Sequence, residues 1–251
     1  MALGLEASEL FHSYDGAPAL DGVSLSVPAG SVTALVGESG SGKTTLLRSF
    51  NRLVVPQRGM VRVGGTDVSR ENPESLRRRV GYVPQHGGLL PHWTIRRNVA
   101  LVPLLTGMAS PDAVADEALR RVGLDPSRFG DRLPRELSGG QRQRAALARA
   151  FAARQQVVLL DEPFGALDAI SRGDAHEVFG RVRSELGFTA LVVTHDLAEA
   201  ARLADQVVVM KQGRVEQAGT VRDLQRSPAT PYVAALFERA RAAGAALEQH
   251  S

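Results

Sequence analysis

The hydrophobic pattern alternates between short apolar runs and stretches whose apolar residues recur at helical spacing, which predicts an α/β protein. Several apolar runs have the length of strands that are buried on both faces. They are residues 32–36, 157–160, 189–193 and 207–210. Helical spacing separates the later runs, over residues 171–186 and 196–203. Strands that alternate with helices in this way imply a mainly parallel sheet with helices on both faces.

The first third of the chain adds further strands and turns around one helix. Residues 5–36 are predicted to form short strands joined by turns, and Gly64-Gly65 between two apolar stretches indicates a hairpin. A helix is expected over residues 42–53, and another short strand over 80–83. The apolar face of that helix is predicted to carry Leu46, Phe50 and Leu53.

The strand pattern is interrupted from about residue 92 to 152. Helices are predicted there over residues 111–122 and 139–153, the second with Ser138 as its N-cap. This block is therefore expected to be a helical subdomain inserted into a single α/β domain that spans residues 1–251. The alanine-rich tail, about 231–251, is expected to be helical as well.

Composition excludes several classes of protein and site. With 43% hydrophobic and 23% charged residues among 251, the chain is not expected to be disordered. It has no cysteine, which excludes disulfides, thiolate metal sites and cysteine nucleophiles. The net charge of +3 is small, and acids lie between most of the arginines. This pattern favours a mixed solvated surface over a nucleic-acid interface.

No targeting or membrane-spanning segment is expected. The first six residues lack a basic stretch followed by an apolar core, so they do not resemble a signal peptide. The longest apolar stretches are short and broken, as Val99–Leu105 is by Pro103. A spanning helix needs about 20 apolar residues.

A glycine-rich loop between a buried strand and a helix has the pattern G-x-x-x-x-G-K-[ST]. Its glycines would let backbone N–H groups surround phosphates at the N-terminus of the helix. Lys43 is expected to reach the outer phosphates, and the hydroxyl of Thr44 to bind Mg²⁺. A chance match in a glycine-rich turn is the alternative, and the strand–loop–helix context argues against it. The expected ATP-binding residues here are Gly37, Glu38, Ser39, Gly40, Ser41, Gly42, Lys43, Thr44 and Thr45.

Two acids follow the apolar run at 157–160. The carboxyl ends of parallel strands form the ligand-binding edge of a sheet, and neighbouring residues of a strand point in opposite directions. Asp161 is therefore expected to bind Mg²⁺ and Glu162 to act as general base for the attacking water. By itself the pattern also suits an exposed acidic strand end, but the phosphate loop favours the catalytic interpretation.

The sequence Leu137-Ser138-Gly139-Gly140-Gln141, directly before a helix, resembles the signature of the ABC ATPases. Other motifs of that family follow the same order. Gln85 matches the glutamine loop that reaches Mg²⁺, Asp168 the D-loop, His195 the switch histidine, and Tyr14 the aromatic residue that stacks on adenine. A lone tyrosine or histidine could instead serve only packing, so these two assignments depend on the motifs around them.

The resemblance covers about residues 5–238. It implies a P-loop NTPase of the ABC ATPase type, with a mainly parallel core, an N-terminal antiparallel β part and the inserted helical subdomain. It also implies ATP and Mg²⁺ as cofactors, and a head-to-tail dimer with a second ATPase subunit, expected to be a homodimer. In that dimer the signature residues contact the partner's ATP. The implied partners are transmembrane permease subunits, served indirectly by a substrate-binding protein, with the chain peripheral on the cytoplasmic side of the plasma (inner) membrane.

The run from Gln85 to Pro103 resembles the importers of glycine betaine, choline and related osmoprotectants. Importers of nitrate, sulfonates and amino acids share much of it and remain alternatives. Some osmoprotectant ATPases carry a regulatory extension after the core, which we do not expect in 251 residues. Leu89–Trp93 is expected to expose apolar side chains as a docking surface for a permease, with ordinary packing as the alternative.

Two other classes of function remain open. One is the ATPase of an ABC exporter, which a cognate permease and the presence or absence of a binding protein would distinguish. The other is a non-transport ABC protein that acts on nucleic acid. Such proteins usually carry two linked ATPase cores or long coiled-coil insertions, and the modest, scattered positive charge also speaks against this class.

Overall fold

A computed structural model of the protein describes residues 2–248, with side chains as far as Ala242. Its centre is a six-stranded sheet in the order β10-β9-β3-β8-β7-β6, in which only the β9–β10 pair is antiparallel. The strands are β3 (Val32–Val36), β6 (Val80–Val83), β7 (Val157–Asp161), β8 (Thr189–Val193), β9 (Gln206–Lys211) and β10 (Arg214–Gly219). The predicted parallel core is confirmed, because each apolar run of the sequence forms a strand of this sheet.

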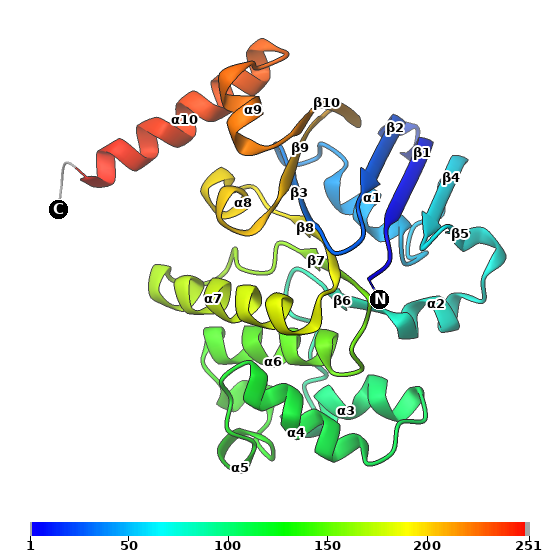
Figure 1. The fold of residues 1–251 in the computed structure, drawn as a ribbon, viewed down its shortest axis with the longest axis vertical. Coiled ribbons are helices and arrows are strands. Elements are labelled where there is room, and N and C mark those ends of the chain that lie inside the picture. The colour runs from blue at the N-terminus through cyan, green and yellow to red at the C-terminus, as the bar shows by residue number, and fades with distance from the viewer. Residues whose placement is uncertain (1, 249–251) are drawn as a thin grey trace.

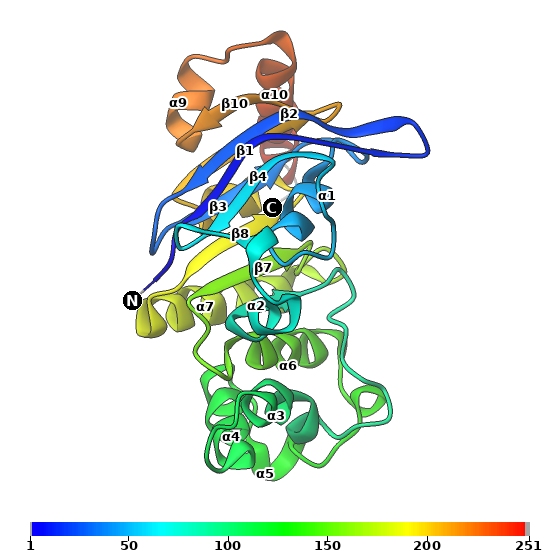
Figure 2. The ribbon, with the colours of Figure 1, turned by 90° about the vertical axis from the view of Figure 1, so that its right-hand side faces the viewer.

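A second, antiparallel sheet in the order β2-β1-β4-β5 lies beside the first (Figure 2). It consists of β1 (Leu5–Tyr14), β2 (Ala17–Val27), β4 (Arg58–Val63) and β5 (Thr66–Asp67). The prediction of short strands before residue 36 was wrong in length, since β1 and β2 have 10 and 11 residues. Asp15 and Gly16 both have positive φ, and this two-residue turn pairs Tyr14 with Ala17 in one long hairpin.

The helix α1 (Lys43–Ser49) lies between the two sheets. Its buried Leu46 and Leu47 share a core with apolar residues of β1, β7 and β8. The predicted extension of this helix to residue 53 was wrong. The helix ends at Ser49, and Arg52 has a φ of 54°, which prevents it from continuing; Leu53 is half exposed rather than part of the apolar face.

The helical insertion between β6 and β7 is confirmed and appears below the sheet in Figure 1. It contains α3 (Ile95–Leu105), α4 (Pro111–Arg121), α5 (Pro126–Phe129), the 3-10 helix η2 (Pro134–Glu136) and α6 (Gly139–Phe151). The α6 helix packs closely on β6. A Cβ on Gly81 of β6 would lie 2.4 Å from the carbonyl oxygen of Ala150, so this approach requires glycine.

The other helices cover the sheet or extend from it. The long α7 packs on the sheet with Phe179 and Val182, and α8 and α10 share a core with β3 and β9. The far end of α10 projects from the body in Figure 1. The bounds are η1 (Val68–Arg70), α2 (Pro73–Arg79), α7 (Ala169–Leu186), α8 (Leu197–Leu203), α9 (Val221–Arg226) and α10 (Pro231–Glu248). In the described part of the chain, no helix combines the length and apolarity needed to cross a bilayer.

Candidate nucleotide site

The phosphate loop, Gly37–Thr44, connects β3 to α1 in a conformation that requires two of its glycines. Gly37 has a φ of 149°, and a Cβ there would lie 2.1 Å from the carbonyl oxygen of Met210. Gly42 has a φ of 98°, and a Cβ there would lie 2.2 Å from the carbonyl oxygen of Ala19. The loop is therefore packed against backbone on both sides, and no side chain fits at either glycine.

Lys43 is buried inside this loop, with 6% of its surface exposed. Its Nζ donates hydrogen bonds to the carbonyl oxygens of Gly37 (2.8 Å) and Glu38 (2.7 Å) and to Oγ of Ser41 (3.2 Å). Burial lowers the pKa of Lys43, and the nearby carboxylates of Glu162 and Asp161 oppose this shift. The ammonium group is thus positioned at the centre of a loop that could exchange these contacts for phosphate oxygens.

Asp161 ends β7 next to the first turn of α1 and is almost completely buried. Its Oδ1 accepts a 2.7 Å hydrogen bond from Oγ1 of Thr44, and its Oδ2 accepts a 3.1 Å bond from Nη2 of Arg48. Tyr82 of β6 contacts the same arginine, whose Nε lies 3.3 Å from the phenol oxygen. Sequence reasoning missed Arg48, although it lies four positions after Thr44 and so on the same face of α1.

Three polar side chains meet at the carboxyl ends of β6, β7 and β8. Nε2 of Gln85 donates a 3.0 Å hydrogen bond to Oε2 of Glu162, and Nδ1 of His195 lies 3.6 Å from that oxygen. Glu162 has a φ of 47°, and its N–H donates to the carbonyl oxygen of Val193. Because these strands are neighbours and parallel, residues far apart in sequence converge on one edge of the sheet.

A cavity of about 410 Å³ opens above the phosphate loop. Its walls include Tyr14 from the tip of the first hairpin, together with Gln85 and Glu162. Half of the surface of Tyr14 is exposed, and its ring packs edge-on against His12 at 4.7 Å. The residues of the loop that line the cavity are Ser39, Gly40, Ser41, Gly42, Lys43 and Thr44, followed by Thr45.

The signature loop, Ser138–Gln141, begins α6 as a capping box. Oγ of Ser138 accepts from the N–H of Gln141, whose side-chain oxygen accepts from the N–H of Ser138. Ser138 and Gly139 are exposed, and none of the four residues lines the cavity above the phosphate loop. The predicted cap is confirmed, and the structure separates this loop from the phosphate loop of the same chain.

Asp168, the predicted D-loop residue, caps the N-terminus of α7. Its Oδ1 accepts a 2.9 Å hydrogen bond from the N–H of Ser171, and this interaction lowers the pKa of the aspartate. The side chain of Asp168 is exposed. The helical turn that it caps lies close to the signature loop, since a Cβ on Gly140 would lie 3.1 Å from Ser171.

Residues 20–165 match the family model described as ABC transporter, which covers the phosphate loop, the signature loop and the acidic end of β7. The chain belongs to the ABC transporter family, as an ATP-binding subunit. The predicted fold class is confirmed as well. This ABC subunit is similar to the dimeric structure of the ATP-binding cassette MJ0796 bound to ADP and Pi. The TM-score is 0.79 and the identity 29%, over 87% of this chain and 99% of that one.

Two curated relatives illustrate the range of transporters to which this ABC subunit is similar. It is 44% identical over 220 residues to the carnitine transport ATP-binding protein OpuCA of Listeria monocytogenes, covering 87% of this chain and 55% of the relative. It is 46% identical over 223 residues to the sulfate/thiosulfate import ATP-binding protein CysA of Nocardia farcinica, covering 88% and 66%. The chain thus spans little more than half the length of the first curated relatives that it matches.

Proposed function

We propose that this subunit binds and hydrolyses ATP to drive a membrane importer, and that the imported solutes are glycine betaine, choline or related quaternary amines. One observation carries the hydrolytic part of the proposal. The ammonium group of Lys43, the Thr44–Asp161 pair and the Glu162 carboxylate with its two neighbours all lie around one cavity or at its sheet edge. This is the arrangement that hydrolysis of a nucleoside triphosphate requires.

In the proposed reaction, Glu162 accepts a proton from the attacking water. The water oxygen forms a bond to the γ-phosphorus while the bond to the β–γ bridging oxygen breaks, which releases ADP and phosphate. Gln85 holds Oε2 of Glu162 by a 3.0 Å hydrogen bond, and Nδ1 of His195 lies 3.6 Å from the same oxygen. His195 is proposed to contact the γ-phosphate. Lys43 supplies positive charge to the outer phosphates, and Tyr14 supports the adenine ring.

The donor set beside the phosphate loop fits Mg²⁺. A hydroxyl and a carboxylate oxygen, from Thr44 and Asp161, already lie 2.7 Å apart, and oxygen ligands are those that Mg²⁺ prefers. Mg²⁺ usually binds through one or two protein oxygens together with waters and substrate phosphates, so ATP is proposed to provide further ligands. Gln85 is proposed as an additional contact. When bound, Mg²⁺ neutralises charge on the phosphates.

Residues 138–141 are proposed to act on the ATP of a second copy of the chain. The exposed, capped N-terminus of α6 is suited to bind an anion, yet it lies outside the cavity above its own phosphate loop. A head-to-tail homodimer would place it over the partner's phosphate loop, with Asp168 at the interface. The likeness to a dimeric cassette bound to ADP and Pi supports this assembly.

The other partners are proposed to be permease subunits, with a substrate-binding protein as an indirect partner and the chain on the cytoplasmic face of the plasma membrane. The docking surface predicted at Leu89–Trp93 requires correction at Leu89, which packs against the core of the helical insertion. Leu90 is 38% exposed, and Trp93 is half-buried beneath the guanidinium of Arg97, at 4.2 Å. Trp93 is therefore the proposed permease contact.

The class of imported solute is proposed from similarity to known transporters. Similarity to a carnitine transport protein supports a quaternary amine, whereas similar identity to a sulfate/thiosulfate import protein supports an oxyanion as the second candidate. The test is uptake of labelled glycine betaine, choline and sulfate at high osmolarity by cells that carry the wild-type gene or Glu162→Gln. Selective loss of betaine or choline uptake in the variant supports the proposal. Selective loss of sulfate uptake would contradict it.

A further inference from the structure

The first turn of α7 adjoins both the signature loop, which would face the partner's ATP, and the D-loop at Asp168. On one side it supports the signature loop: a Cβ on Gly140 would lie 3.1 Å from both Cβ and Oγ of Ser171. On the other side, Asp168 caps the same turn through the N–H of Ser171. A displacement of this turn would therefore shift the signature loop and the D-loop together.

Arg172, the next residue, extends this connection to the switch histidine. Its Nη2 donates a 2.8 Å hydrogen bond to the carbonyl oxygen of Leu167, beside the D-loop aspartate. Its Nη1 lies 3.9 Å from Oδ2 of Asp196, which directly follows His195. Asp196 also caps α8, where its Oδ1 accepts from two backbone N–H groups. One guanidinium thus contacts the loops that carry Asp168 and His195.

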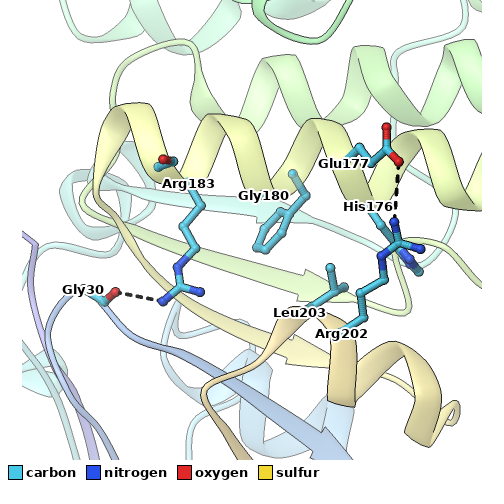
Figure 3. A pocket seen from close by; sticks show the side chains of 9 residues that line it. Gly30, His176, Glu177, Gly180, Arg183, Arg202 and Leu203 are labelled. Atoms are coloured by element: carbon cyan, nitrogen blue, oxygen red, sulfur yellow. Dashed lines mark hydrogen bonds and ion pairs between the residues drawn. The ribbon is translucent and has the colours of Figure 1, made fainter.

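Arg172 and two buried polar residues of α7 and α8 are incompletely hydrogen-bonded. In the described part of the chain, Nε of Arg172, Nε2 of His176 and Oε1 of Glu199 are buried without a hydrogen-bond partner. Of these three residues, His176 lines a cavity of about 540 Å³ between α7 and α8, where Figure 3 shows it beside Arg202.

We propose that Arg172 is a positioning residue that couples the two ATP half-sites within one subunit, by joining the α7 turn that supports the signature loop to the loop of the switch histidine. The proposal rests on the proposed function, because it requires ATP at both places. The signature loop would sense the partner's ATP, and the Leu167–Arg172–Asp196 contacts would transmit its position to His195 at the subunit's own ATP. The result would be cooperative hydrolysis by the homodimer.

The test compares Arg172→Met with Arg181→Met in the full chain. Arg181 is a matched control, since it lies on the same helix and donates one 2.9 Å bond to a backbone carbonyl, that of Arg121, far from the two loops. For each protein we would measure the rate of ATP hydrolysis against ATP concentration, and the binding of a trinitrophenyl-ATP probe. Thermal unfolding establishes that the variants are folded.

We expect wild type to hydrolyse ATP with a Hill coefficient approaching 2, the number of sites in the dimer. Arg172→Met should lower the maximal rate by roughly 10- to 100-fold, as loss of one hydrogen bond from a charged group does, and bring the Hill coefficient to about 1. Probe affinity should change by less than about twofold, because Arg172 does not line the nucleotide cavity. Arg181→Met should resemble wild type.

Two results would overturn the coupling while leaving the ATPase assignment intact: an active wild type without cooperativity, or an Arg172→Met variant whose rate and Hill coefficient match those of Arg181→Met. A loss of probe binding equal to the loss of rate would also overturn it, since the residue would then act on binding. A folded wild type that neither binds the probe nor hydrolyses ATP would instead refute the proposed function itself.

Discussion

Oγ1 of Thr44 donates a 2.7 Å hydrogen bond to Oδ1 of Asp161, which joins the first turn of α1 to the end of β7 across 117 positions of sequence. Arg48 holds the other oxygen of the same carboxylate. The buried aspartate is therefore oriented by two side chains of α1. This relationship supports the assignment of Mg²⁺ to this place, because it brings together two oxygen ligands from separate motifs.

Replacing Asp161 by asparagine should weaken the use of Mg²⁺ without unfolding the protein. The amide keeps the size of the side chain but removes the charge that attracts the cation. We expect the Mg²⁺ concentration for half-maximal ATP hydrolysis to rise about 10- to 100-fold, the range typical for altered metal shells. Titration of Mg²⁺ at fixed ATP measures this. An unchanged midpoint would remove Asp161 from the metal site.

Alanine at Gly42 and at Gly180 should change stability in opposite directions. Gly42 has a positive φ and no room for a Cβ, so Gly42→Ala should lower the free energy of unfolding by about 1–3 kcal/mol and impair nucleotide binding. Gly180 lies inside α7, and a Cβ there meets nothing within 4 Å. Gly180→Ala should therefore raise that free energy by about 0.5–1 kcal/mol. Urea titration measures both, and equal effects would contradict the described loop conformation.

Glu199 and His176 should give the stability of the protein opposing pH dependences. Burial raises the pKa of Glu199 from 4.5 to about 7, so its contribution to stability is fully present below about pH 4.5 and is lost as the pH rises through 7. Burial, with Arg202 and Arg172 nearby, lowers the pKa of His176 to about 4, so its contribution is lost as the pH falls from 6.5 towards 4. Between about pH 4.5 and 6.5 the two should largely cancel.

Glu199→Gln separates these contributions. Each pKa difference of one is worth about 1.4 kcal/mol, so ionised Glu199 destabilises the fold at pH 8 by about 3 kcal/mol. The variant should therefore gain stability relative to wild type at pH 8 and lose that advantage at pH 5. Thermal unfolding at both values tests this. A stability difference that is the same at pH 8 and pH 5 would show that Glu199 does not titrate in this range.

Trp93→Asp should weaken assembly with the permease and leave ATP binding unchanged. The half-buried ring lies on the helical insertion, apart from the residues that line the nucleotide cavity. A charge at a buried apolar contact costs binding free energy because it must be desolvated. Co-purification with the cognate permease measures the effect, with probe binding as the control. Undiminished co-purification would exclude Trp93 from the interface.

The sequence predicted the elements whose signals are local. The strands 80–83 and 189–193 and the cap at Ser138 are confirmed, because buried apolar runs and capping residues determine them directly. The extent of the helix after the phosphate loop was predicted wrongly, since the left-handed turn at Arg52 depends on the packing around it. The pairing of Arg172 with Leu167 and Asp196 could not be predicted either. It depends on how α7 and α8 lie together, which no spacing in the chain specifies.

The most direct test of the account is a comparison of ATP binding and ATP turnover by wild type and Glu162→Gln. Glutamine keeps the size of the side chain and can still contact Gln85 and His195, but it cannot accept the proton of the attacking water. We predict that the variant binds ATP with Mg²⁺ as tightly as wild type and hydrolyses it at least about 100-fold more slowly. Turnover at the wild-type rate would contradict the assignment of Glu162 as the general base.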